Sequence, residues 1–244
     1  MNHPTANAKD PMDRSDWAPG SAKVRPPSAK VQLQVFDTYE SVARAAADLL
    51  AERLSAGGRA VLAGGRTPRL AYALFGKADL LWHRLQLIPS DERCLPIEHP
   101  ERNDRAIALA LGTRGYTLHR FPAELGPEPA AEQMERAVRE LLPFDLALLG
   151  LGEDGHTASL FPGNPALESV RLVVPVHHAP KAPPERVSLG LYALSQARTV
   201  IYLVAGAEKQ EALRRLLAGE DIPPNRVQAH EIIVLADRAA RGEG

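Results

Sequence analysis

The chain has 244 residues, of which 45% are hydrophobic and 24% charged, which is ordinary for a globular protein with one α/β domain or two small ones. The formal net charge of −1 gives no long-range field that would attract nucleic acid or an anionic membrane, so neither is expected as a partner. One cysteine, Cys94, excludes an internal disulfide and a cysteine-based zinc site. No apolar run approaches the ~20 residues of a membrane span and no signal peptide is visible, so a cytoplasmic location is expected.

Residues 1–30 are rich in proline and scattered charge and have almost no periodic apolar residues. This composition predicts a disordered N-terminal tail, with a docking segment as the alternative. No linker or internal repeat follows residue 30. Residues 31–244 are therefore predicted to form a single α/β domain.

The first part of this domain alternates between strand and helix patterns. Residues 31–35 alternate as in a strand, and Asp37 with Glu40 resembles a capping box that would open the next helix. A short apolar strand is predicted at 60–63, followed by a helix from Pro68 to about residue 75. The expected buried face of the earlier helix follows i, i+3, i+4 spacing and consists of Val42, Ala45, Ala46, Leu49, Leu50 and Leu54.

The remainder of the chain continues this alternation, which predicts a mostly parallel sheet with helices on both faces. Right-handed crossovers would then bring the loops that follow the strands to one edge of the sheet. A helix is also expected to begin at Thr157, and residues 89–96 are interpreted as a loop. The other predicted strands are 85–88, 145–149, 172–176, 187–191, 199–205 and 232–235, and the other predicted helices are 103–111, 132–142 and 207–217.

A glycine-rich turn follows the strand at 60–63. Gly64 and Gly65 would let backbone N–H groups approach an anion, and Thr67 would add a hydroxyl at the positive end of the next helix. The turn matches neither a Walker A loop nor the G-x-G-x-x-G dinucleotide pattern. It therefore predicts a site for the phosphate of a small molecule, with an ordinary strand-to-helix turn as the alternative.

The segment 144–163, FDLALLGLGEDGHTASLFPG, carries the best candidates for catalysis. A buried strand leads into a glycine-rich turn that holds Asp154 and His156. His156 is predicted to accept and return a proton near neutral pH, and Asp154 to orient it or to bind a sugar hydroxyl. The alternatives are that His156 caps the next helix and that Asp154 only supports the turn. Ser159 does not lie in a G-x-S-x-G elbow, so a serine nucleophile is not expected.

Charged side chains in other loops are expected to reach the same edge of the sheet. Arginine and lysine there could bind phosphate or carboxylate, although each taken alone would be an ordinary surface cation. The remaining histidines show no metal-ligand spacing, so no metal site is predicted. The charged positions are Asp91 and Arg93 after the strand at 85–88, Lys181 and Arg186 around a proline-rich loop, and Lys209 after the strand at 199–205.

Taken together, these segments resemble the 6-phosphogluconolactonases of the bacterial pentose phosphate pathway. The resemblance is carried, in the family's order, by LAGGRTP at 62–68, SDERCLP at 90–96, HPERND at 99–104, the segment 144–163, KAPPERVSLGL at 181–191 and LVAGAEKQEAL at 203–213. It implies a modified Rossmann-like fold of the kind shared with glucosamine-6-phosphate deaminases and ribose-5-phosphate isomerases. It also implies hydrolysis of 6-phospho-D-glucono-1,5-lactone, with no metal or organic cofactor.

The resemblance assigns expected roles to residues of this chain. His156 and Asp154 are the expected catalytic pair. The residues expected to bind the sugar phosphate are Gly64, Gly65, Arg66, Thr67, Asp91, Arg93, Lys181 and Arg186. The chain departs from the family's usual residues at Arg66, where a small residue is usual, at Arg102, where serine is usual, and at Ser188, where threonine is usual.

Two other functions stay open from the sequence. Sugar-phosphate deaminases of the same fold also carry a G-x-D-G-H turn, but their pattern continues with a Phe-Asn-Glu-Pro type segment. This chain instead has TASLFPG at 157–163 and lacks that glutamate. The second alternative is a non-catalytic sugar-phosphate sensor, which would not need the Asp154–His156 pair. The oligomeric state is not predicted.

Overall fold

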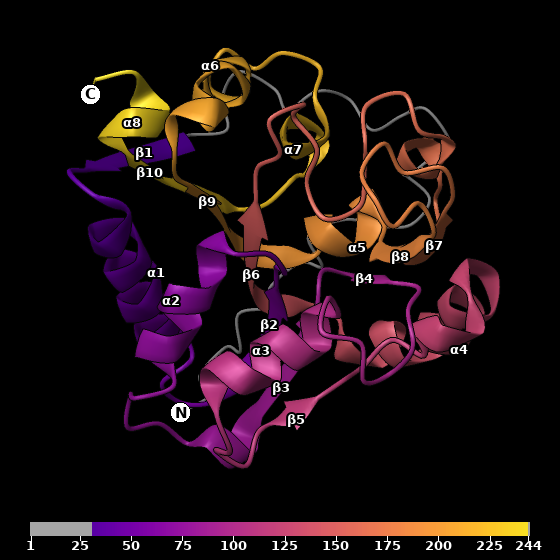
Figure 1. Ribbon diagram of the computed structural model, residues 1–244. Helices are drawn as coiled ribbons and strands as arrows, with labels where there is room; N and C mark the ends of the chain where they lie inside the picture. The colour runs from indigo at the N-terminus through magenta and orange to yellow at the C-terminus, as the bar shows by residue number, and fades with distance from the viewer. Residues whose placement is uncertain (1–30, 244) are drawn as a thin grey trace, which may run out of the picture.

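The computed structural model describes residues 31–243, in which helices surround two β-sheets (Figure 1). The larger sheet has seven parallel strands in the order β1–β10–β9–β6–β2–β3–β5. These strands are β1 (Val31–Phe36), β2 (Gly58–Leu62), β3 (Leu85–Pro89), β5 (Thr117–Leu118), β6 (Phe144–Gly150), β9 (Ala197–Val204) and β10 (Glu231–Asp237). The predicted α/β class with a mostly parallel sheet is confirmed, whereas the predicted tail at 1–30 lies outside the described residues.

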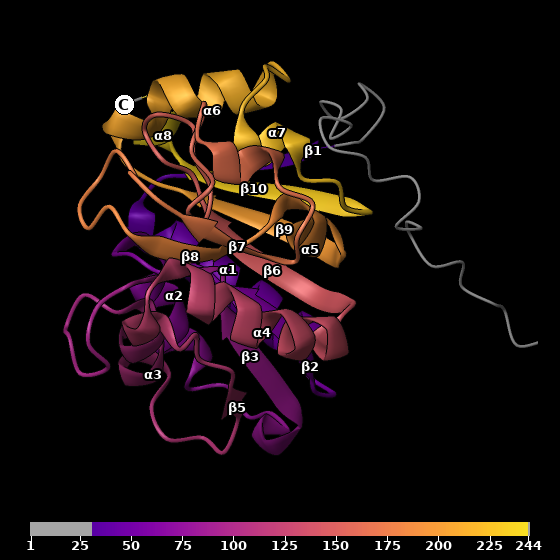
Figure 2. The same cartoon turned by 90° about the vertical axis from the view of Figure 1, so that its right-hand side faces the viewer.

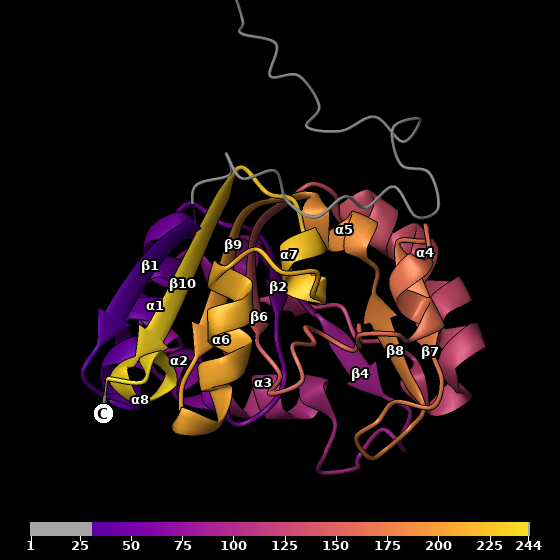
Figure 3. The same ribbon diagram turned by 90° about the horizontal axis from the view of Figure 1, so that it is seen from above.

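The smaller sheet is antiparallel, with the order β4–β8–β7. It consists of β4 (Asp91–Arg93), β7 (Val173–Val176) and β8 (Arg186–Leu189). Figure 3 shows β7 and β8 at the opposite side of the molecule from β1. The prediction that 89–96 is only a loop is therefore wrong. Three residues are too few to show strand alternation, and β4 exists because it pairs with β8, far along the chain.

Helices cover both faces of the large sheet, as predicted. The side chains of β6 show why. Leu146 and Leu148 pack with the residues of α1, α2 and α3, whereas Ala147 and Leu149 pack in the cluster on the other face, which includes residues of α4, α5 and α6. Figure 2 shows α6 and α7 above the strands β9 and β10. The helices are α1 (Tyr39–Arg53), α2 (Thr67–Phe75), α3 (Asn103–Leu111), α4 (Pro127–Leu141), α5 (Leu191–Ser195), α6 (Gln210–Leu217), α7 (Pro223–Arg226) and α8 (Arg238–Arg241).

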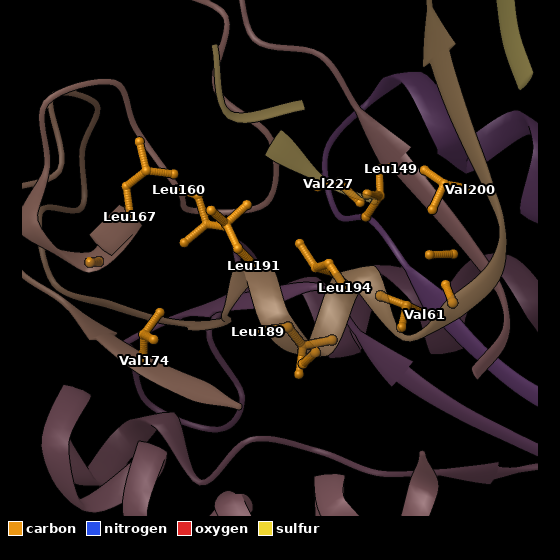
Figure 4. Packing of buried hydrophobic residues seen from close by; sticks show 14 of the residues in the cluster. Val61, Leu149, Leu160, Leu167, Val174, Leu189, Leu191, Leu194, Val200 and Val227 are labelled. Carbon is orange, nitrogen blue, oxygen red and sulfur yellow. The ribbon is translucent and has the colours of Figure 1, made fainter. Parts of the chain in front are cut away.

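One apolar cluster joins the two sheets (Figure 4). Leu191 and Leu194 of α5 lie between Leu149 of the large sheet and Val174 and Leu189 of the small one. Because all five side chains are at most 1% exposed, the small sheet shares the core of the large one. No helix within residues 31–243 has the length and apolar character needed to cross a membrane.

The start of α1 differs from the prediction. Its N-cap is Thr38, whose side-chain oxygen accepts a hydrogen bond from the Ser41 amide at 3.3 Å. Asp37 instead pairs with Arg238, with 3.0 Å between Oδ1 and Nε. The buried face of α1 is also shifted relative to the prediction, because Ala45 and Leu49 are only partly buried. Its buried residues are Val42, Ala43, Ala46, Ala47 and Leu50, followed by Leu54 just after the helix.

No helix begins at Thr157, so that prediction is wrong. The backbone of Thr157 forms an antiparallel bridge with Leu160, and its hydroxyl donates to the Gly150 carbonyl at 2.9 Å. Proline and glycine at 162 and 163 interrupt any helical run here. The first helical turn after His156 is the short 3₁₀ segment Pro165–Glu168. The alternative role of His156 as a helix cap is therefore also wrong.

Candidate active site

A cavity of about 380 Å³ lies where the loops after β2, β3, β6 and β9 meet the loop between β7 and β8. The parallel strands end at the same edge of the sheet, which brings four of these loops together. The sequence-predicted residues that line the cavity are Gly64, Gly65, Arg66, Thr67, Asp91, Arg93, His156, Lys181, Arg186 and Lys209. Asp154 is hydrogen-bonded to His156 but is not among the residues that line the cavity.

Several lining residues were not named individually among the predicted site residues. They are Ser90, Asn103, Glu153 and Glu208, together with apolar residues of the same loops. Ser90 and Glu153 each lie next to a predicted residue in the sequence, so their position could have indicated them. Asn103 opens α3, and nothing in its local pattern indicates that it reaches this cavity.

The Asp154–His156 pair forms as predicted. Asp154 Oδ1 lies 2.5 Å from His156 Nδ1 and also accepts from the His156 amide at 3.2 Å. Burial alone would raise the pKa of the Asp154 carboxyl, but the hydrogen bonds and charge of His156 lower it to about 2. An ionised carboxylate only accepts hydrogen bonds, so in the neutral imidazole Nδ1 carries the proton. The lone pair is then on Nε2, free to take a proton.

The turn at 152–156 depends on a glycine at its first position. A Cβ at Gly152 would lie 2.0 Å from His156 Nδ1 and 2.6 Å from Asp154 Oδ1. The amides of Gly152 and Gly155 donate to the carbonyls of His156 and Gly152, at 2.8 and 3.0 Å. Neither amide is therefore available to a bound anion, and the carboxylate and the imidazole pack directly on the turn.

Gly152→Ala is expected to reduce kcat for the lactone hydrolysis that the motifs predict by at least ~10²-fold. The new methyl group would occupy the place of the imidazole, and displacing a group that takes part in a reaction can lower the rate by this factor. The loop is not part of the core strands, so the unfolding midpoint should change little. Steady-state kinetics and thermal unfolding of the variant would check both. A variant with normal kcat would show that the ring position is not set by this contact.

The two glycines of the first turn have different roles. Gly64 must lack a Cβ, because that atom would lie 1.9 Å from Asn103 Oδ1. Gly65 has φ +95, in the region that glycine adopts without strain. The amides of both glycines have no acceptor within residues 31–243. The Tyr72 hydroxyl donates to the Ala63 carbonyl at 2.8 Å, which fixes the end of β2 just before them. Two open amides at the N-terminal end of α2 suit an anion.

Asp91 is 5% exposed and both of its carboxylate oxygens are hydrogen-bonded. The Ser90 hydroxyl donates to Oδ1 at 2.7 Å, and the Ser159 hydroxyl donates to Oδ2 at 2.6 Å. The Ser159 oxygen in turn accepts from Arg186 Nη1 at 3.4 Å. Ser159 is fully buried and outside the cavity lining, so it links Asp91 to Arg186 and is not placed as a nucleophile.

Arg186 holds the loop between β7 and β8 against the cavity. Its guanidinium donates to the carbonyls of Pro183, Lys181 and Ala182 at 3.0, 2.8 and 3.3 Å. Its Cζ also lies 5.5 Å from the centroid of the Phe161 ring, which contacts the His156 ring with 4.5 Å between centroids. Burial lowers the pKa of Arg186, and the nearby Asp91 opposes this. Arg186 therefore connects His156, through Phe161, to the loop that carries Lys181.

Arg93 and Asn103 are positioned by a buried carboxylate. Glu92 accepts from the Arg93 and Asn103 amides at 2.8 and 2.7 Å, and from the Asp104 amide at 2.8 Å. Burial raises the pKa of Glu92 to about 7, although these N–H groups oppose the rise. Arg102 forms ion pairs with Glu92 at 3.8 Å and with Asp104 at 3.0 Å. The side chains of all three charged residues are at most 1% exposed, so a buried ion-pair network ties β4 to the start of α3.

His177 joins the same loop to α4. Its Nδ1 and Nε2 each lie 2.5 Å from a carboxylate oxygen, of Glu185 and Glu128 respectively. Both nitrogens must carry protons to donate to two carboxylates, so the arrangement requires the imidazolium. Burial alone would lower the pKa of His177, but these two hydrogen bonds raise it above 6.5. The charged contact therefore exists at pH values below the raised pKa of His177.

His177→Gln is expected to cost stability that depends on pH. Because the folded pKa of His177 is raised, its contribution is fully present below about pH 6.5 and is lost as the pH rises through the folded pKa. The difference in the free energy of unfolding between wild type and variant should thus be largest near pH 6 and smallest near pH 9. Urea unfolding across this range measures it. His178→Gln is the matched control, because the neighbouring exposed histidine pairs with no carboxylate of residues 31–243.

Within residues 31–243, no three histidine, cysteine, aspartate or glutamate side chains are grouped so that they could hold a metal ion. That the reaction needs no metal or organic cofactor stays a prediction.

The family model described as "Glucosamine-6-phosphate isomerases/6-phosphogluconolactonase" matches residues 35–235. The chain belongs to this family. The resemblance inferred from the sequence motifs is therefore confirmed, and the cavity described above lies within the matched residues.

Several similar proteins are named 6-phosphogluconolactonase. A 6-phosphogluconolactonase of Homo sapiens is 35% identical over 232 residues, which cover 81% of this chain and 87% of the relative. A 6-phosphogluconolactonase of Synechocystis sp. is 34% identical over 201 residues, which cover 75% and 83%. The crystal structure of a 6-phosphogluconolactonase from Thermotoga maritima superposes with a TM-score of 0.75 at 29% identity, covering 85% of this chain and all of that one.

Proposed function

We propose that this chain hydrolyses 6-phospho-D-glucono-1,5-lactone to 6-phospho-D-gluconate, the reaction of the oxidative pentose phosphate pathway that its relatives' name indicates. The observation that carries the proposal is the Asp154–His156 pair at a cavity with five cationic side chains in its lining. A volume of about 380 Å³ is within the ~300–1,000 Å³ range of small-molecule sites. The cations are Arg66, Arg93, Lys181, Arg186 and Lys209.

In the proposed mechanism, His156 is the general base. Its Nε2 takes a proton from water while the water oxygen attacks C1 of the lactone. The tetrahedral intermediate then collapses, the C1–O5 bond breaks, and His156 returns the proton to the ring oxygen. Asp154 keeps Nδ1 protonated and stabilises the imidazolium that exists between the two transfers.

The phosphate end of the substrate is assigned to the first glycine turn. The open amides of Gly64 and Gly65 and the Thr67 hydroxyl would contact it at the start of α2, and the cations of the lining would balance its charge. Binding the phosphate there places the lactone carbon relative to His156 without using the reacting atoms. Asp91 and Arg186 support the wall of the site through Ser159.

The test is turnover. Acid release from 6-phosphogluconolactone at constant pH should exceed the spontaneous rate in proportion to protein concentration. The absence of an excess rate would contradict the proposal and favour a non-catalytic sensor. Release of ammonia from glucosamine 6-phosphate is the second arm and is expected to be absent. A cytoplasmic location and the lack of a nucleic-acid partner remain predictions from the sequence.

A further inference from the structure

We propose that Glu153 is a displaceable counter-anion. Its carboxylate forms ion pairs with the ammonium groups of Lys181 and Lys209 until the phosphate of the substrate replaces it. The proposal rests on the proposed function, because it takes a phosphate ester as the competing anion. Glu153 is thereby a residue that sets affinity, distinct from the residues assigned to catalysis.

The geometry joins three separate loops at one oxygen. Glu153 Oε1 lies 3.9 Å from Lys181 Nζ and 3.7 Å from Lys209 Nζ. Lys181 belongs to the loop between β7 and β8, and Lys209 is the N-cap of α6. The turn that carries Lys209 is held at the end of β10, because the Gly206 amide donates to both carboxylate oxygens of Asp237 at 3.1 Å. The two ammonium groups are thus held close enough together to share one anion.

Within residues 31–243, Glu153 is the only carboxylate that forms an ion pair with a cation of the cavity lining. Arg66, Arg93 and Arg186 form none there. Asp91 is engaged by two serine hydroxyls, and Glu208, which also lines the cavity, pairs with no cation of the described chain. The contact is therefore selective for the two lysines and is not a general feature of a charged wall.

The contact has the properties of a reversible one. Both distances exceed hydrogen-bond length, and the Glu153 side chain is 54% exposed, so water screens the pair and the attraction is weak. A phosphate carries up to two negative charges and three acceptor oxygens, so it can bond both ammonium groups at shorter range. Glu153 can move to solvent by side-chain rotation alone, leaving the neighbouring Asp154 on His156.

Two consequences follow for the site. Before substrate binds, the lysines are partly neutralised, so other anions bind less well. After the reaction, the product phosphate competes with the returning Glu153 carboxylate for the same two ammonium groups. Glu153 therefore weakens product binding as well as substrate binding, and removing its charge strengthens both.

The experiment is isothermal titration of 6-phosphogluconate, and separately of inorganic phosphate, into the wild type and Glu153→Gln at low ionic strength. Loss of two weak ion pairs should lower the Kd of the variant by about threefold to tenfold. Glu208→Gln is the matched control, because it removes the same charge from the same cavity without freeing a lysine; its Kd should change by less than ~2-fold. In Glu153→Gln combined with Lys209→Met, the gain should be reduced.

Each outcome decides the proposal. An unchanged or weaker affinity in Glu153→Gln would overturn it, and so would an equal gain in Glu208→Gln, which would reduce the effect to net charge. The inorganic phosphate arm separates this proposal from the proposed function. If the wild type fails to hydrolyse the lactone while Glu153→Gln still gains phosphate affinity, the enzymatic assignment fails and the counter-anion stands.

Discussion

His156→Ala should lower kcat for lactone hydrolysis by about 10²–10⁴-fold, the usual contribution of a positioned general base. The change removes Nε2, the atom proposed to take the proton from water, while the cations of the cavity lining remain. KM should therefore change much less than kcat. Initial rates corrected for spontaneous hydrolysis, measured at several substrate concentrations, separate the two parameters.

The control for this substitution is His178→Ala, at an exposed histidine outside the cavity lining, which should keep the wild-type kcat. The unfolding midpoint of His156→Ala should stay close to that of the wild type, because the ring is only partly buried. A His156→Ala protein with wild-type kcat would remove His156 from the mechanism but would leave the family assignment intact.

Arg102→Met is expected to reduce the free energy of unfolding by about 3–5 kcal/mol, the usual cost of removing one partner from a buried ion pair. Arg102 is 1% exposed, and its loss leaves the buried Glu92 carboxyl without an ion-pair partner and Asp104 with only the half-exposed Arg120, 4.0 Å away. Hydrogen bonds to the Leu95 and Phe121 carbonyls are lost as well. Urea unfolding followed by circular dichroism at neutral pH measures the difference.

Arg105→Met is the matched comparison, since Arg105 lies in the first turn of α3, three residues after Arg102, and pairs with Glu98 at 2.6 Å in an exposed position. An exposed pair contributes about 0–1 kcal/mol, so this variant should be nearly as stable as the wild type. If Arg102→Met lost no more stability than Arg105→Met, the buried network would have no special weight. Glu92 also accepts a hydrogen bond from the Asn103 amide, and Asn103 lines the cavity. A destabilised Arg102 variant should therefore bind phosphate more weakly too.

The sequence predicted the elements whose pattern is local. Period-two and period-3.6 spacing located the strands of the large sheet, apart from the two-residue β5, and indicated α1 to α4 and α6. Parallel order then brought the residues that follow β2, β3, β6 and β9 into one cavity. The Asp154–His156 contact was predictable because the two residues share one turn, with Gly152 before Asp154 and Gly155 between Asp154 and His156.

Features that depend on distant segments were not predictable in this way. β4 is a strand only through β8, and the start of α3 is capped by Glu92, which is remote in sequence. The ion pairs of Glu153 with Lys181 and Lys209 join three loops that local periodicity cannot place relative to one another. The helix predicted after His156 does not form. The Thr157 hydroxyl instead donates a hydrogen bond to the Gly150 carbonyl, and the Ser159 hydroxyl donates one to the distant Asp91 carboxylate.

The pairing of β1 with β10 determines when the sheet can be completed during synthesis. Val31 lies opposite Ile232, so the first strand of the described chain waits for a partner made about 200 residues later. At ~5–20 residues per second, this delay lasts on the order of 10–40 s, during which β1 has no neighbour on the ribosome. The strands that carry the cavity loops, β2, β3, β6 and β9, emerge earlier. Cotranslational folding should therefore assemble the cavity first and add the β10–β1 edge last.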